Sequence, residues 1–137
     1  MSNALYDPGR EGFLDGSINW TTGSVDDIRV MLVRTGYSYS AAHKFMSDVT
    51  TEWDNGRSAT LAARTATNGV ADADDVSLTA VTGSASNAVI IYQNNGSDAT
   101  NRLIAYIDTA TGLPVTPAAA GTVNIAWDSG ANKIFKL

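Results

Sequence analysis

The feature of this sequence that most constrains its fold is a series of short Val- and Ile-rich runs separated by turn-forming residues. In "DVSLTAV" (75–81) apolar and polar residues alternate, and "DIRVMLV" (27–33) and "TVNIAWD" (122–128) also place apolar residues at every second position. A period of two puts successive side chains on opposite faces, which indicates a strand. Gly, Asn, Asp and Ser cluster between the runs, as in antiparallel proteins. We therefore predict a mainly β fold, an antiparallel β-sandwich or flattened barrel, with one short helix.

Two runs depart from this alternation. "AVIIY" (88–92) is apolar throughout, which is typical of a strand covered on both faces. In "SYSAAHKFMSDV" (38–49), Ser40 can cap a helix, and apolar residues follow at roughly helical spacing. The short helix is therefore predicted over residues 40–48.

The same alternation predicts which side chains form the core. Trp127 is assigned to the core because it is in phase with Val123 and Ile125. Trp20 follows Ile18 at strand spacing and is also expected to pack inward. The predicted core consists of Ile28, Val30, Leu32, Val76, Leu78, Ile90, Leu103, Ile125 and Trp127.

The length of 137 residues is enough for one domain with a core of its own. No repeat or long linker divides the chain, so we predict a single domain over residues 1–137, with a β core over residues 27–137. Residues 1–20 can form an N-terminal arm. Gly9 and Gly12 disfavour a helix in that arm, because glycine costs about 1 kcal/mol relative to Ala inside a helix.

Charge and composition exclude several classes of function. The net charge is −5 and the nine Lys and Arg residues are scattered, whereas surfaces that bind nucleic acid or anionic membranes carry clustered cations. We expect no nucleic-acid partner and no membrane partner. Cysteine is absent, so the chain has no disulfide and no thiolate chemistry. Residues 1–13 lack the basic and apolar segments of a secretory signal, and we expect a cytoplasmically made, soluble protein.

The sequence carries no recognisable catalytic or cofactor-binding motif. His43 is the only histidine, so a Ser-His-Asp triad or a His-ligated metal would have to use it. Gly-x-Ser-x-Gly, Gly-x-Gly-x-x-Gly and phosphate-binding-loop patterns are all missing. A small hydrolase that uses two carboxylates is not excluded by sequence, since such pairs need only meet in space. We predict no enzyme activity, no catalytic residue and no cofactor.

The densest acidic cluster is Asp72, Asp74 and Asp75 in "GVADADDVSL" (69–78). A calcium loop of the EF-hand type starting at Asp72 needs Gly at its sixth position and Glu at its twelfth, where this chain has Ser77 and Ser84. A looser calcium site between β loops stays an alternative. We interpret the cluster as a turn followed by a solvated strand start, and we predict no metal site.

Four side chains are candidates for contact with a partner protein. Leu5 and Tyr6 lie near the start of the chain, where Pro8 and several glycines allow the backbone to follow a neighbour's surface. Phe13 can pack either inward or against that neighbour. Trp53 lies in the polar stretch "TTEWDNGR", so it is a candidate for an exposed recognition ring.

Four stretches of the chain together resemble a family of small proteins encoded among the virion structural genes of tailed bacteriophages. They are "LYDPGREGFLDGSINWTTGSVDDIRVMLV", "SAAHKFMSDV", "NGVADADDVSLTAV" and "LIAYIDTATGLPVTP…VNIAWDSGANKIFKL", and they cover nearly the full length. These motifs carry no chemistry, so the resemblance implies a setting and assigns no binding residue. It implies a virion protein assembled in the cytoplasm of the bacterial host, with the phage major capsid protein or other virion proteins as partners.

The resulting prediction is a non-enzymatic head decoration or cement protein that binds and stabilises the head shell. A tail, neck or fibre component is the structural alternative, and a homo-oligomer stays open in both cases. A carbohydrate-binding β-module is an alternative of a different class. Binding to a capsid without affinity for sugars would separate the first prediction from the last.

Overall fold

The computed structural model describes residues 3–21, 27–117 and 121–137. All strand pairs among these residues are antiparallel. The fold is mainly β and sandwich-like and is not a closed barrel. The predicted fold class of an antiparallel β-sandwich is therefore confirmed.

A five-stranded sheet has the order β1 (Ala4–Leu5), β7 (Arg102–Ile107), β6 (Ser86–Asn94), β2 (Asp27–Arg34) and β3 (Asp54–Arg57). One two-stranded sheet pairs β5 (Val76–Val81) with β8 (Gly121–Ile125), and another pairs β4 (Val70–Ala71) with β9 (Phe135–Lys136). The helices are α1 (Asp7–Asp15) and α2 (Met46–Val49), and single 3-10 turns lie at Thr51–Trp53 and Thr67–Gly69.

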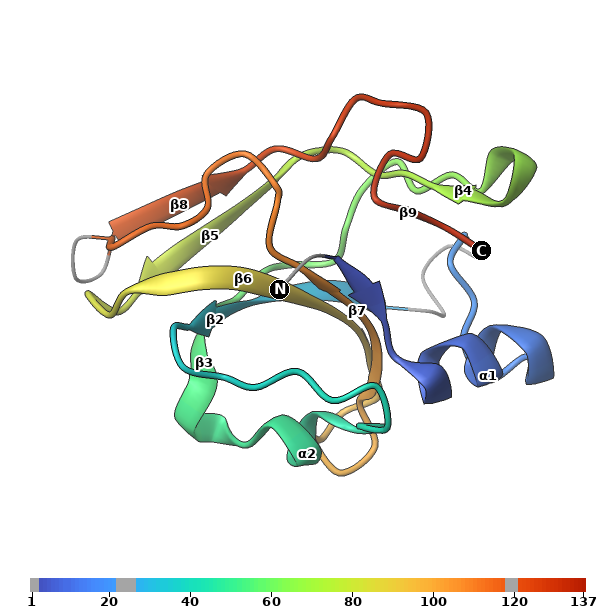
Figure 1. Cartoon of the computed structure of the whole chain (residues 1–137), viewed down its shortest axis with the longest axis horizontal. Helices are drawn as coiled ribbons and strands as arrows, with labels where there is room; N and C mark the ends of the chain where they lie inside the picture. The colour runs from blue at the N-terminus through green and yellow to red at the C-terminus, as the bar shows by residue number, and fades with distance from the viewer. Residues whose placement is uncertain (1–2, 22–26, 118–120) are drawn as a thin grey trace.

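The five-stranded sheet is the middle layer of the fold. The strands β4, β5, β8 and β9 lie over one of its faces, and α2 with the preceding loop lies over the other (Figure 1). Each face of the sheet is therefore buried. The side between the sheet and the two small sheets is called the first core here, and the side toward α2 the second core.

Alternation along β2 supplies side chains to both cores. Ile28, Val30 and Leu32 pack in the first core, whereas Met31 and Val33 point to the opposite face and pack in the second. Residues 88–92 of β6 are buried on both faces, as predicted for the apolar run "AVIIY". The prediction of a doubly covered strand is confirmed.

Every residue of the predicted core is buried except Val76, which is partly buried against the first core. Ile90 and Leu103 are buried in the second core, whereas the other residues of the predicted core pack in the first. Sequence periodicity separates inward from outward residues along one strand but does not reveal that both faces are covered.

Residues 7–15 form the helix α1, although Gly9 and Gly12 disfavour a helix there. Both glycines are buried on the side that faces β7. A Cβ atom on Gly9 would lie 2.8 Å from the carbonyl oxygen of Leu103. The helix therefore approaches the strand more closely than any larger residue would allow, and packing outweighs the low helix propensity.

Replacing Gly9 with Ala is expected to destabilise the fold, although the same change in an exposed helix stabilises by about 1 kcal/mol. The added methyl group would overlap the Leu103 carbonyl oxygen, and overpacking of this kind costs about 1 to 2 kcal/mol. Urea unfolding of Gly9→Ala against the exposed helix variant Glu11→Ala measures this difference. An increase in stability for Gly9→Ala would contradict the close packing of α1 on β7.

The helix predicted over residues 40–48 is largely incorrect, because only Met46–Val49 is helical. Phe45 is extended (φ −118°, ψ 160°) and forms a β-bridge with Arg102. The Asp48 carboxylate accepts hydrogen bonds from the backbone N–H groups of Lys44 and Phe45 at 2.8 and 3.0 Å. Long-range pairing with β7 thus competes with the local helical pattern and prevails before residue 46.

None of the helices in the described ranges combines the length and apolar character that crossing a bilayer requires.

Candidate functional site

Leu5 and Tyr6 are buried within the chain itself, with 7% and 0% of their surface exposed. Leu5 pairs with Ala105 in the sheet and packs in the first core, whereas Tyr6 packs in the second. Residues 3–21 are thus part of the domain, not a free arm, in this fold. The prediction that Leu5 and Tyr6 contact a neighbouring subunit is therefore wrong, because both side chains are buried in this domain's own cores.

A chain of hydrogen bonds holds Tyr6 in place. Its hydroxyl lies 3.0 Å from that of Tyr37, which in turn lies 3.0 Å from Nδ1 of His43. Tyr39 donates to the Leu5 carbonyl oxygen at 2.7 Å. Burial raises the pKa of the Tyr6 hydroxyl well above its ordinary value, so it stays protonated. His43 is half-buried and joins this hydrogen-bond network through Nδ1.

Trp53 is half-buried and packs against the second core. A Cβ atom on Gly36 would lie 2.9 Å from the Trp53 ring, so the indole rests directly on glycine backbone. The predicted exposed recognition ring is thus only partly exposed, and its contact with a partner stays a prediction. The prediction rested on the polar residues beside Trp53 in the sequence. Those residues carry no information about Gly36, which lies against the ring.

The aspartate cluster contributes backbone oxygens to the packing of two tryptophans. Nε1 of Trp20 donates to the Asp72 carbonyl oxygen at 3.2 Å, and Nε1 of Trp127 donates to that of Asp74 at 3.0 Å. The Asp75 carboxylate accepts the backbone N–H of Trp127 at 3.0 Å. Asp75 also precedes β5 and is exposed, as the interpretation of a solvated strand start requires. In the described ranges, no group of three or more His, Asp or Glu residues is arranged to hold a metal ion.

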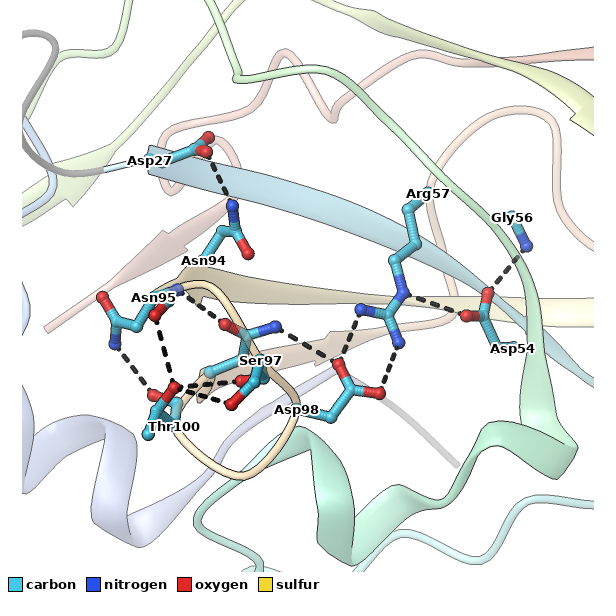
Figure 2. Close-up of polar contacts among 10 residues, drawn as sticks. Asp27, Asp54, Gly56, Arg57, Asn94, Asn95, Ser97, Asp98 and Thr100 are labelled. Atoms are coloured by element: carbon cyan, nitrogen blue, oxygen red, sulfur yellow. Dashed lines mark hydrogen bonds and ion pairs between the residues drawn. The ribbon is translucent and has the colours of Figure 1, made fainter.

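Arg57 is the centre of the most extensive polar network in the described part of the chain (Figure 2). Its guanidinium donates to both carboxylate oxygens of Asp98 at 2.7 and 2.9 Å, and Nε donates to Asp54 at 2.9 Å. These hydrogen bonds from Arg57 hold the pKa of Asp98 below its ordinary value. The guanidinium also lies 5.5 Å above the Tyr92 ring centroid.

The loop between β6 and β7 is fixed by this network. The Asp98 carboxylate also accepts Nδ2 of Asn101 at 3.2 Å, and the Asp98 carbonyl oxygen accepts the backbone N–H of Ser47. The Asn101 amide oxygen in turn accepts the backbone N–H of Asn95 at 2.6 Å. These contacts join β3, α2 and the loop, and we assign the network a structural role.

A second carboxylate, Asp27, starts β2 in a similar setting. Burial acts to raise its pKa, but hydrogen bonds from Arg29, Thr60 and Asn94 outweigh burial and lower the pKa to about 2. Figure 2 shows the Asn94 amide directed at this carboxylate. Asp27 is therefore ionised at neutral pH and unsuited to deliver a proton.

The best candidate for binding a partner is a pocket of about 360 Å³ lined by three aromatic side chains, here called the aromatic pocket. Phe13 of α1, Trp20 and Phe135 of β9 line it, and the Phe135 ring centroid lies 6.0 Å from that of Phe13 and 5.2 Å from that of Trp20. Leu137, 58% exposed, lies at its edge. Leu14, next to Phe13 in α1, is 88% exposed.

Sequence reasoning found part of this pocket and missed the rest. Phe13 was a candidate with two destinations, and it packs partly against the first core while lining the pocket. Trp20 packs inward as predicted, with 5% of its surface exposed. No local signal in the sequence places Phe135 and Leu137 beside residue 13.

Comparisons with known proteins identify no relative. No family model matches the chain, and neither curated proteins nor solved structures give a match.

Proposed function

We propose that this chain is a non-enzymatic structural protein of a tailed-bacteriophage particle, a decoration protein that binds the head shell through the aromatic pocket. The observation that supports the proposal is the meeting of Phe13, Trp20 and Phe135 around one open pocket. Aromatic side chains contribute a disproportionate share of the binding energy at protein interfaces. A pocket of this kind suits an apolar side chain of another virion protein.

The burial of the tryptophans supports a protein ligand over a sugar. A carbohydrate-binding site needs an aromatic face that is open to stacking. Trp20 and Trp127 are at most 8% exposed, and Trp53 rests on Gly36. The remaining aromatic surface of the pocket is divided among tilted rings and offers no flat platform.

The sharpest test blocks the aromatic pocket without removing any core side chain. Ala66 is exposed and lines the pocket, so Ala66→Arg places a long charged side chain there. We expect purified Ala66→Arg protein to bind particles that lack this chain about tenfold or more weakly, the loss typical of a blocked interface anchor. Co-sedimentation with the particles, followed by cryo-electron microscopy of the decorated shell, measures binding and location.

Ala42→Arg is the matched control, because Ala42 is also exposed but does not line the aromatic pocket. Both variants should keep the thermal unfolding profile of the original protein. Equal binding by Ala66→Arg and Ala42→Arg would show that the pocket is not the attachment site. Density at the tail, neck or fibres instead of the head would replace the decoration role with the structural alternative.

A further inference from the structure

A second pocket, of about 370 Å³, is lined in part by residues of β1 and β9 and borders the first core. Its floor includes the buried side chains of Leu5, Ala105 and Ile134. Both strands at its sides are sheet edges among the described strands, because β1 pairs with β7 and β9 pairs with β4. The pocket is thus an opening between the layers of the sandwich, and it is called the edge pocket here.

The charged residues that line the edge pocket are mostly cationic. Arg10, Lys133 and Lys136 contribute positive charge, and Asp128 is the single carboxylate among the residues that line it. This balance is opposite to that of the whole chain, whose net charge is −5. A local excess of one sign on a protein of the other sign attracts ligands by charge complementarity.

These cations are poorly neutralised within the chain. In the described ranges, neither Lys133 nor Lys136 forms an ion pair. Arg10 pairs with Asp7 at 3.2 Å, but both side chains are more than half exposed, and such pairs contribute little. The Asp128 carboxylate accepts the backbone N–H of Gly130 at 3.2 Å, within its own turn. Lys133 and Lys136 therefore bring positive charge to the edge pocket without an ion-pair partner in the described ranges.

The backbone at Lys133 supports the same interpretation. Lys133 has a φ of 47°, in the left-handed region that side-chain-bearing residues rarely adopt and that Asn tolerates better. Such strained positions gather at functional sites, where the surrounding structure holds them. Gly or Asn would adopt this backbone conformation more easily, so a lysine at this position adds backbone strain.

We propose that the edge pocket binds an extended acidic segment of a partner protein, whose carboxylates contact Arg10, Lys133 and Lys136. An extended segment fits because side chains on a strand alternate, so that carboxylates can reach the cations while apolar side chains face the floor. Edge strands on either side can also offer backbone groups to such a segment. The proposal goes beyond the aromatic pocket and does not require a virion setting.

The test uses the full chain and a fluorescein-labelled eight-residue peptide that alternates Glu with Val. The same peptide with Ser in place of every Glu is the probe control. Fluorescence anisotropy is expected to show binding of the Glu peptide only, weakening as ionic strength rises to about 1 M, where charges are screened beyond about 3 Å. Lys133→Asn and Lys136→Gln should each lower the affinity about tenfold, since each removes a charge-assisted contact.

Lys44→Gln is the matched control for the protein, because Lys44 lies over the Phe45 ring and does not line the edge pocket. It should leave peptide affinity unchanged. Lys133→Asn should fold with unchanged or greater stability, because Asn tolerates the left-handed backbone. Loss of affinity together with retained stability separates a binding role of Lys133 from a structural one.

Three outcomes would overturn the proposal. The first is equal binding of the Ser and Glu peptides, or binding of neither. The second is displacement of the Glu peptide by duplex DNA at lower concentration, which would assign the pocket to phosphate. The third is concentration-dependent dimerisation in sedimentation that Lys133→Asn abolishes, which would make a second copy of this chain the occupant.

Discussion

Replacing Trp127 with Ala is expected to lower the free energy of unfolding by about 3 to 5 kcal/mol, the range measured for large buried aromatic residues. Only 8% of the Trp127 surface is exposed, and the indole packs in the first core at the end of β8. Truncation would leave a cavity and would also strip the Asp74 carbonyl oxygen of its indole N–H donor. Domains of this size are stable by about 5 to 15 kcal/mol, so the loss is a large share.

Urea unfolding followed by far-ultraviolet circular dichroism measures this loss. Trp127→Phe helps to separate its two causes, because Phe keeps an aromatic ring in the core but is smaller than Trp and lacks the N–H donor. Its expected cost is about 1 to 3 kcal/mol for the unsatisfied carbonyl group and the lost volume. Leu14→Ala is the surface control and should change stability by less than about 0.5 kcal/mol, since Leu14 is 88% exposed. A loss below about 1 kcal/mol for Trp127→Ala would mean that the ring is not packed.

The location of Trp127 illustrates what can be predicted from sequence alone. Its inward phase follows from the alternation with Val123 and Ile125, and both of those residues are buried. Along β2 the same rule places Ile28, Val30 and Leu32 on one face. A strand with a period of two has only two faces, so the apolar pattern alone decides which one turns inward.

The helix α1 depends on a contact between distant parts of the chain, which local sequence patterns do not predict. Helix propensity counts Gly9 as a cost, but the benefit of Gly9 is the close approach to Leu103, which lies far along the chain. Leu5 and Tyr6 were misplaced for the same reason. Their burial depends on pairing with β7, about a hundred residues away, and no local pattern encodes that contact.

The two pockets were also beyond prediction from sequence, though their residues carried partial signals. Phe13 and Phe135 come from the two ends of the chain and meet only because α1 and β9 end near each other (Figure 1). Lys133 follows the stretch "SGAN" (129–132), and no local pattern there predicts the left-handed backbone of this lysine. Pockets depend on the docking of several elements, whereas local patterns describe one element at a time.

The Arg57 network leads to the second large effect. Replacing Arg57 with Met keeps most of the aliphatic stem and removes the guanidinium, leaving Asp54 and Asp98 without their shared cation. The side chains of all three are about a quarter to a third exposed, so water compensates in part. We expect a loss of about 2 to 3 kcal/mol, the range for hydrogen bonds to charged groups. Arg10→Met, which breaks only an exposed pair, should cost less than about 1 kcal/mol.

The pH dependence of that loss distinguishes the ion pair from simple packing. The pKa of Asp98 is lowered in the folded chain by Arg57, so its contribution to stability is present above the ordinary carboxyl pKa of about 4 and disappears as pH falls through the lower folded value. The stability difference between the original protein and Arg57→Met should therefore shrink as the solution is acidified below about pH 4. In Asp98→Asn, which has no carboxylate to titrate there, Arg57→Met should show a smaller loss at neutral pH and a weaker acid dependence. A loss that stays constant from neutral to acidic pH would mean that the Arg57 guanidinium contributes through its contact with the Tyr92 ring, not through Asp98.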